Sequence, residues 1–250
     1  METEIILHRG YKGKYLENSL SSFENAIKEN KSFETDIRVS KDKKTFMIHD
    51  ESLDRLLNAN GGVIEYNSEE LKRVKYLEDG SHLVPFEELL NLIKDNPTYS
   101  EKIFVHIKQL WNIKSVMESL DSLDFDLSER LRFFACDDIT LGLVGTMKGH
   151  FPEYKVGLHL TENSPYKNEE HFERADFIWA DEITKENITP EVVILAHSLG
   201  KPIYAISPEL IPESVFNEEI ERRWKELVKA GVDGICTDKP TELSKFLNNY

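Results

Sequence analysis

Short apolar segments rich in Ile, Val and Phe alternate along this chain with longer stretches in which apolar residues recur every three or four positions. The short segments have the length and composition of buried strands, and the longer ones have the period of amphipathic helices. The predicted strands are Glu4–Leu7, Phe33–Val39, Thr45–Ile48, Ile103–Ile107, Arg132–Ala135, Lys155–Leu158, Phe177–Trp179, Ile203–Ile206 and Gly234–Cys236. The predicted helices are Ser19–Glu29, Phe86–Lys94, Asn112–Leu120, Asp138–Lys148, Pro190–Ser198, Glu218–Ala230 and Pro240–Leu247.

Strands that alternate with helices are typical of α/β folds with a parallel sheet. The number of strand–helix units exceeds that of a flavodoxin-like sheet and favours a TIM-type (β/α)8 barrel, for which about 250 residues is the usual length. A doubly wound open sheet is the second choice. Segment 51–84 has weak periodicity and is interpreted as a small insertion after the third strand. No Pro/Gly/Ser-rich linker divides the chain, so we expect one domain over residues 1–250.

The charge balance restricts the partners of the protein. The chain has 31 Lys plus Arg against 46 Asp plus Glu, for a formal net charge of −15. Affinity for polyphosphate comes mainly from Lys and Arg, so a nucleic-acid or anionic-membrane partner is not expected. A local cluster of cations can still bind one small phosphate.

The ends of the chain and its cysteines indicate a cytoplasmic protein. Cys136 and Cys236 lie in no CxxC or Cys/His cluster, which argues against a zinc ribbon or a disulfide framework. The N-terminus has no basic segment followed by an apolar stretch, and no apolar run has transmembrane length. We therefore expect no signal peptide and no membrane span.

Two histidines follow predicted strands. His8-Arg9-Gly10 comes directly after the first strand, and His49-Asp50 comes after the third. In a barrel, residues at the carboxyl ends of strands face the mouth where barrel enzymes work. We therefore place His49 at the same end of a strand neighbouring that of Glu34 and Asp36. Two histidines across a pocket suit general acid–base cleavage of a phosphodiester, although a lone histidine in a loop is commonly structural.

The second predicted strand carries a possible metal site. Glu34 and Asp36 are separated by one residue, so their side chains emerge on the same face. Two carboxylates on an inner barrel face repel each other unless a cation lies between them, and oxygen ligands of this kind suit Mg²⁺ or Ca²⁺. The alternative is a solvated pair of carboxylates on an edge strand.

Later strands add further polar side chains. His106 and Lys108 share one face at the end of a strand. A lysine on an inner barrel face favours an anion, so Lys108 is a candidate phosphate ligand; the alternative is a lysine that extends to the rim. His159 and Trp179 also end strands and could line the mouth, with a packing role favoured for Trp179.

These motifs resemble the glycerophosphodiester phosphodiesterase family, which shares its barrel with the phosphatidylinositol-specific phospholipases C. The resemblance spans nearly the whole chain. The matching residues are His8-Arg9-Gly10, Glu17-Asn18-Ser19, Phe23, Ala26, Phe33-Glu34-Thr35-Asp36, Lys41-Asp42, Ile48-His49-Asp50, Leu53, Asp54-Arg55, Val84-Pro85-Phe86-Glu87-Glu88-Leu89 and Gly231-Val232-Asp233-Gly234-Ile235-Cys236-Thr237-Asp238-Lys239-Pro240.

The resemblance implies metal-dependent hydrolysis of a glycerophosphodiester to an alcohol and glycerol phosphate, in lipid metabolism. A cyclic phosphate is the intermediate that the resemblance suggests. The roles that it implies are acid–base catalysis for His8 and His49, metal binding for Glu34 and Asp36, and phosphate binding for Arg9 and Lys108. The partner is then a small-molecule phosphodiester. Alternatives are the same chemistry on a glycerol-phosphate-bearing sugar, polymer or nucleotide, release of the cyclic phosphate, and a barrel that binds a phosphorylated ligand without catalysis.

The chain departs from the family in two places. The family has a glutamate as third metal ligand where this chain has His106, so we expect a divalent cation, with Mg²⁺ first and Mn²⁺ or Ca²⁺ as alternatives. His106 could instead contact the substrate. The family's Trp-Thr-Val-Asn strand corresponds to Tyr204-Ala205-Ile206-Ser207, so Tyr204 is a candidate substrate-binding residue and glycerophosphocholine need not be the substrate.

Overall fold

Eight parallel strands close into a barrel in the computed structural model, which describes residues 3–109, 111–136, 140–164, 168–182, 186–210 and 217–250. The strands follow one another around the barrel in the order β1-β9-β8-β7-β6-β5-β4-β2, and the β1–β2 pairing closes it. These strands are β1 (Glu4–Leu7), β2 (Phe33–Val39), β4 (Ile103–Ile107), β5 (Leu131–Ala135), β6 (Lys155–Leu160), β7 (Phe177–Ala180), β8 (Ile203–Ile206) and β9 (Gly234–Thr237). The predicted TIM-type barrel is confirmed, and the predicted strand ends differ from the observed ones by at most two residues.

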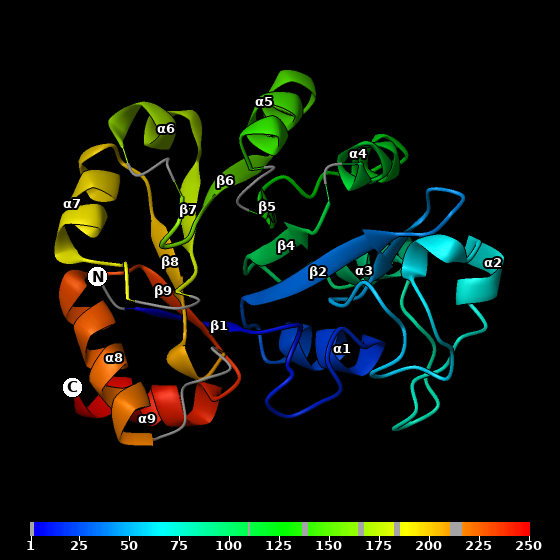
Figure 1. Ribbon diagram of the computed structural model, residues 1–250, viewed down its shortest axis with the longest axis horizontal. Coiled ribbons are helices and arrows are strands. Elements are labelled where there is room, and N and C mark those ends of the chain that lie inside the picture. The colour runs from blue at the N-terminus through cyan, green and yellow to red at the C-terminus, as the bar shows by residue number, and fades with distance from the viewer. Residues whose placement is uncertain (1–2, 110, 137–139, 165–167, 183–185, 211–216) are drawn as a thin grey trace.

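Helices surround the barrel (Figure 1). They are α1 (Leu20–Lys28), α3 (Phe86–Lys94), α4 (Asn112–Asp121), α5 (Thr140–His150), α6 (Glu169–Arg174), α7 (Pro190–Ser198), α8 (Asn217–Ala230) and α9 (Pro240–Asn249). Ser19 caps α1 by accepting a hydrogen bond from the Ser22 amide. The start predicted for α5, at Asp138, lies outside the described residues. No helix within the described ranges is both long and apolar enough to cross a membrane.

The sequence analysis missed α6 because this helix has six residues, too few for a periodic pattern to show. Phe172 is its one buried side chain, and the other positions of the helix are charged or polar. Its start is nevertheless marked by Asn168, whose side chain accepts a hydrogen bond from the His171 amide.

The third strand, β3 (Thr45–Met47), lies outside the barrel. It runs antiparallel to β2, with Ile37 opposite Met47, so the expectation that His49 ends a strand parallel to its neighbour is wrong in direction. β2 extends beyond the barrel rim and β3 returns the chain toward it, where the Ile48 amide donates to the Asp36 carbonyl. His49 therefore reaches the carboxyl end of the barrel because the strand turns back.

Segment 51–84 continues from β3 and packs on a small apolar cluster of its own beside β2 (Figure 1). The segment contains the 3-10 helix η1 (Val63–Glu65) and the short helix α2 (Ser68–Leu71). The buried side chains of the cluster are Phe46, Ile48, Leu53, Leu57, Val63, Leu71, Val74, Tyr76 and Leu83. The predicted insertion is therefore present, with β3 as its first element.

Alternation along the strands fills the barrel interior in layers. Aromatic and apolar side chains occupy the lower layers: Ile6, Phe104, Phe134, Phe177, Trp179, Tyr204 and Cys236. Two positions further along β4, the same face presents His106, level with Asp36 of β2. The polar residues of the barrel therefore lie above a closely packed aromatic floor.

Gly157 tests this packing. A Cβ atom at Gly157 would lie 2.3 Å from a ring carbon of Phe177, on the neighbouring strand β7. We expect Gly157→Ala to lower the free energy of unfolding by about 1–3 kcal/mol, because the ring must shift within a close-packed interior. Urea denaturation measures the change. Gly145→Ala is the matched control, because its Cβ meets no atom within 4 Å and alanine favours the helix. Equal losses in both variants would contradict the packing described.

Candidate active site

A cavity of about 180 Å3 lies at the carboxyl end of the barrel. It is smaller than the roughly 300–1,000 Å3 that encloses a drug-sized ligand. Its lining residues are His8, Arg9, Glu34, Asp36, His49, His106, Lys108, Trp179, Asp181, Glu182, Ile206 and Leu210. The barrel thus brings together the candidate site residues that the sequence indicated, with the exceptions of Tyr204 and His159.

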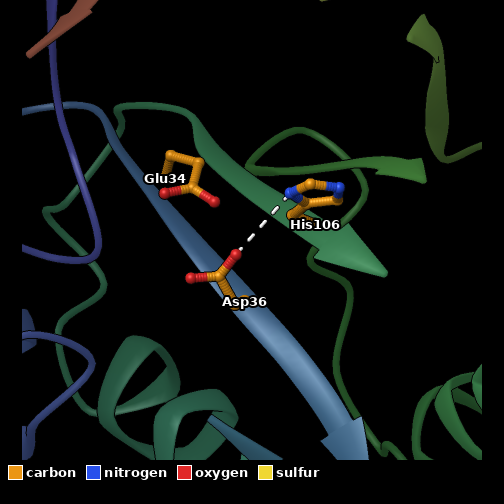
Figure 2. A group of neighbouring side chains, drawn as sticks. All are labelled: Glu34, Asp36 and His106. Carbon is orange, nitrogen blue, oxygen red and sulfur yellow. Dashed lines mark ion pairs between the residues drawn. The ribbon is translucent and has the colours of Figure 1, made fainter. Parts of the chain in front are cut away.

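The side chains of Glu34, Asp36 and His106 converge (Figure 2). The two carboxylates lie on one face of β2, and His106 comes from β4, whose register sets it beside Asp36. One ligand atom of each residue lies within 4.8 Å of those of the other two, and Nδ1 of His106 is 3.6 Å from Oδ1 of Asp36. All three side chains are buried. The carboxylates are therefore an internal pair and not the solvated edge pair of the alternative interpretation.

The charges at this group favour a cation. Burial raises the pKa of Glu34 well above its usual range, and the negative charge of Asp36 raises it further. Burial also acts to raise the pKa of Asp36, but the charge of Lys108 and of neighbouring groups holds that pKa well below its usual range. Oδ1 of Asp36 is buried and accepts no aligned hydrogen bond from the described residues. Two buried carboxylates side by side are the surroundings that a divalent cation stabilises.

His106 is suited to act as a metal ligand. Burial, and after it the charge of Lys108, lowers the pKa of His106 well below its usual range. The imidazole is therefore neutral at neutral pH, which leaves a ring nitrogen able to bind a metal. Its Nδ1 faces Asp36, and its Nε2 lies 3.4 Å from the sulfur of Cys136.

Lys108 lies inside the site. Its Nζ is 2.8 Å from Oδ1 of Asp36 and 2.9 Å from Nδ1 of His106. Its side chain is 10% exposed, so it does not extend to the rim as the alternative interpretation had it. Arg9 approaches the same carboxylate, with its Nε 3.7 Å from Oδ2 of Asp36. Two cations thus flank the carboxylates within the cavity.

Glu17 and Asn18 hold the side chains of Arg9 and Asp36 by hydrogen bonds. Neither residue was assigned a role in the sequence analysis. Glu17 accepts hydrogen bonds from Arg9, at 2.8 Å, and from Arg55, at 2.6 Å. Asn18 has a left-handed backbone, with φ of 51°, and donates its side-chain amide to Oδ2 of Asp36 at 3.1 Å. The Glu17-Asn18-Ser19 motif was visible in the sequence, but nothing in its spacing showed which residues it would meet.

His8 and His49 have the same type of partner. Nδ1 of His8 is 2.8 Å from Oδ1 of Asp238, which follows β9, and Nδ1 of His49 is 2.8 Å from Oδ1 of Asp50. Each carboxylate orients its imidazole and can stabilise the protonated ring, as in other His–Asp pairs. Nε2 of His8 lies 4.0 Å from Oε2 of Glu34. The two histidines therefore stand beside the buried carboxylates, each held through Nδ1.

The carboxylates that hold the histidines remain ionised. Burial acts to raise the pKa of Asp238, but the hydrogen bond from His8 and the contact with Lys12 lower it overall. For Asp50, burial is likewise outweighed by the hydrogen bonds from Arg55 and His49, which lower its pKa to about 2. Both histidines thus face a negatively charged partner at neutral pH. Burial lowers the pKa of His49 itself.

Tyr204 does not line the cavity, so its proposed contact with the substrate is corrected. It faces inward from β8 in the aromatic floor, where its ring centroid is 4.8 Å from that of Phe104, and it is 5% exposed. Ile206, two residues further along the same inner face, lines the cavity in its place. Trp179 also lines the cavity while it packs on Phe134.

Asp181 and Glu182, just after β7, are cavity residues that the sequence analysis missed. Glu182 is buried and accepts two hydrogen bonds from Arg223 of α8, 41 residues away. No motif around Asp181 or Glu182 marks them in the sequence, and their partners His159 and Arg223 lie on other elements.

A TIM-type barrel with two carboxylate-held histidines beside a buried Glu/Asp/His group has the features of a phosphoric diester hydrolase. Residues 8–242 match the glycerophosphoryl diester phosphodiesterase family, and the chain belongs to this family of enzymes.

Relatives cover the chain from end to end. Glycerophosphodiester phosphodiesterases of Bacillus altitudinis and Caldanaerobacter subterraneus are 27% and 26% identical, over 98% and 97% of both chains respectively. A solved Oleispira antarctica phosphodiesterase, in complex with the product sn-glycerol-3-phosphate, has a TM-score of 0.77 at 18% identity, covering 99% of this chain and 97% of that one. A putative glycerophosphoryl diester phosphodiesterase from Silicibacter pomeroyi has a TM-score of 0.78 at 18% identity, covering 99% and 94%.

Glu17 tests how the cations of the site are held. Glu17→Gln removes the buried charge between Arg9 and Arg55, and we expect it to lower the free energy of unfolding by roughly 2–4 kcal/mol, because a buried cation loses its partner. Urea denaturation measures the loss. Glu69→Gln makes the same chemical change in an exposed pair with Lys72 and should alter stability little. Similar small effects in both variants would contradict a structural role for Glu17.

Proposed function

We propose that the protein hydrolyses a glycerophosphodiester to an alcohol and glycerol phosphate, with His8 and His49 as the acid–base pair. The observation that carries this proposal is that both histidines, each held through Nδ1 by a carboxylate, line the same small cavity as Glu34 and Asp36. Acid–base cleavage of a diester needs two such groups, one for the attacking oxygen and one for the leaving oxygen.

The first step forms a cyclic phosphate. His8 takes the proton from the substrate hydroxyl next to the phosphate, and Asp238 stabilises the imidazolium that results. The hydroxyl oxygen bonds to phosphorus while the bond from phosphorus to the leaving oxygen breaks, and His49 gives a proton to that oxygen. The lowered pKa of His49 makes its protonated form a ready donor. Water then opens the cyclic phosphate with the two histidines in exchanged roles, which yields glycerol phosphate and restores both protonation states.

Arg9 and Lys108 line the cavity beside these histidines and are the cations that we assign to the phosphate. Lys108 is nearly buried and Arg9 is fixed by Glu17, so both charges are presented with little freedom of movement. Charged donors fixed in advance stabilise charge that develops on phosphate oxygens during the reaction.

Glu34, Asp36 and His106 fit a divalent cation, because two buried carboxylates and a neutral imidazole converge with their ligand atoms within 4.8 Å of one another. When bound, the cation would lower the pKa of the attacking hydroxyl and neutralise charge on the phosphate oxygens. We assign Mg²⁺ to this site, with Mn²⁺ as the second choice. One nitrogen among three protein ligands disfavours Ca²⁺, which prefers oxygen.

A barrel that binds its ligand without turnover is less well supported. Such a protein has no need of a carboxylate behind each histidine, yet Asp238 and Asp50 both hold their imidazoles at 2.8 Å.

Substitution of the histidines tests the acid–base pair. We expect His8→Ala and His49→Ala each to lower the turnover number for glycerophosphodiesters by roughly 100- to 10,000-fold, because each removes one proton transfer. Release of alcohol and glycerol phosphate is measured by mass spectrometry, and His82→Ala, outside the cavity, is the control. A diester without a hydroxyl next to the phosphate should not be cleaved. Unchanged turnover in either variant, or cleavage of that diester at the normal rate, would overturn the steps described.

A second set of variants tests the metal assignment. We expect a chelator to abolish turnover and Mg²⁺ to restore it, and we expect His106→Glu to bind Ca²⁺ more tightly relative to Mg²⁺ than the wild type does. Calorimetric titration of each cation gives the affinities directly. His150→Glu, on the exposed side of α5, adds the same charge away from the site and should leave the ratio unchanged. A ratio that is equal in wild type and His106→Glu would show that His106 does not bind the metal.

A further inference from the structure

Asp181 lies on the cavity wall opposite the candidate metal group. It follows β7, which is four strands from β2 around the eight-stranded barrel. The apolar side chains of Trp179, Ile206 and Leu210 line the cavity on this side. The cavity therefore has one wall of cations, histidines and carboxylates around β2 and another wall that is mainly apolar except for the acidic residues after β7.

The Asp181 carboxylate is held firmly but is short of hydrogen-bond donors. Its backbone amide donates to the Leu160 carbonyl at 2.8 Å, and its carbonyl accepts from the Asn187 side chain at 3.0 Å. Nε2 of His159 lies 2.9 Å from Oδ2, but Oδ1 is buried and accepts no hydrogen bond from the described residues. A partly buried carboxylate in this condition has a desolvation cost that a donor from a ligand would offset.

The neighbouring acid shows the contrast. Glu182 accepts hydrogen bonds from Nε and Nη2 of Arg223 and from the amides of Asn187 and Ile188. Its oxygens are therefore fully used within the protein. Asp181 is the cavity carboxylate after β7 that still has capacity to accept from a ligand.

His159 supports Asp181 from below and is not itself a lining residue of the cavity. Its side chain is 6% exposed, its backbone amide donates to Oγ1 of Thr140, and its ring lies beside Phe134. This packing holds the imidazole in position, with its Nε2 2.9 Å from the carboxylate. Because its backbone amide and carbonyl are both hydrogen-bonded, Asp181 is a fixed acceptor and not a mobile surface acid.

We propose that Asp181 is a specificity-determining residue that accepts a hydrogen bond from the terminal hydroxyl group of the glycerol moiety that remains on the phosphate. This proposal rests on the proposed function. Arg9 and Lys108 would hold the phosphate on one wall, with the hydroxyl next to it facing His8, and Asp181 would meet the terminal hydroxyl across the cavity.

The size of the cavity supports the glycerol side of the substrate over the leaving alcohol. A volume of about 180 Å3 has room for a small phosphorylated polyol and leaves the second alcohol at the mouth. His49, the proton donor for that alcohol, is the more exposed histidine, with 35% of its side chain accessible against 14% for His8. A quaternary ammonium head group also has no N–H to donate to the Asp181 carboxylate.

Calorimetric titration of three probes in the presence of Mg²⁺ tests the proposal. The probes are sn-glycerol 3-phosphate, propane-1,2-diol 1-phosphate, which lacks only the terminal hydroxyl, and inorganic phosphate. We expect the wild type to bind glycerol phosphate roughly tenfold or more tightly than propane-1,2-diol 1-phosphate, because hydrogen bonds to a charged group discriminate by this amount. Asp181→Ala and Asp181→Asn should reduce this preference to less than about threefold while inorganic phosphate binding stays within twofold, which also shows that the variants are folded. Glu173→Gln, an exposed acid on α6, should retain the wild-type preference.

Three other outcomes would overturn the assignment of Asp181. Equal weakening of all three probes in the Asp181 variants would make the residue structural, and an unchanged preference would exclude it from recognition. Weaker binding of glycerophosphocholine with normal binding of glycerol phosphate would mean that the carboxylate meets the head group. Turnover of glycerophosphodiesters by the wild type is measured in parallel. A wild type that shows the preference without turnover would contradict the proposed function and leave the role of Asp181 standing.

Discussion

The repulsion between two buried carboxylates, Glu34 and Asp36, is the constraint around which the site is arranged. Both project from one face of β2 into a barrel whose lower layers are closed by aromatic rings, so water cannot solvate them from below. Two cations offset this repulsion: Lys108, just after β4, and Arg9, just after β1, both approach the Asp36 carboxylate. A divalent cation at the proposed site would complete the same balance.

Barrel geometry converts this constraint into a reaction site. Because parallel strands all end at one rim, His8 and the acids of β2 line the same cavity although they are far apart in the sequence. His49 arrives differently, on an antiparallel strand that turns back from beyond the rim and is anchored to β2. The two histidines thus belong to different supports, one in the barrel and one in the insertion. The opposite wall carries Asp181 beside the packed imidazole of His159, which gives the cavity a polar group away from the cations proposed to bind the phosphate.

The sequence predicts the barrel and most of the cavity because both follow from short-range patterns. Alternation sets Glu34 beside Asp36, and position at strand ends places His8 and Lys108. The sequence does not show the direction of a strand or its long-range partners. β3 was therefore predicted as another strand of the barrel, because composition does not reveal whether a strand runs parallel or antiparallel to its neighbour. Tyr204 was assigned to the substrate from its correspondence to the family's tryptophan, but its depth in the barrel depends on the register of β8 with its neighbours, which the sequence does not show. The pairing of Asp238 with His8 and of Arg223 with Glu182 could not be predicted either, because each pair is separated by more than 40 residues in the sequence.

The central claim is that Glu34, Asp36 and His106 hold a divalent cation beside two acid–base histidines. Anomalous diffraction from crystals grown with Mn²⁺, recorded above the manganese absorption edge, tests it directly. We expect one strong peak bonded to these three side chains, lost in Asp36→Asn crystals, in an enzyme that is inactive in chelator. Phosphodiester turnover that persists in chelator, together with no peak at these residues, would contradict it.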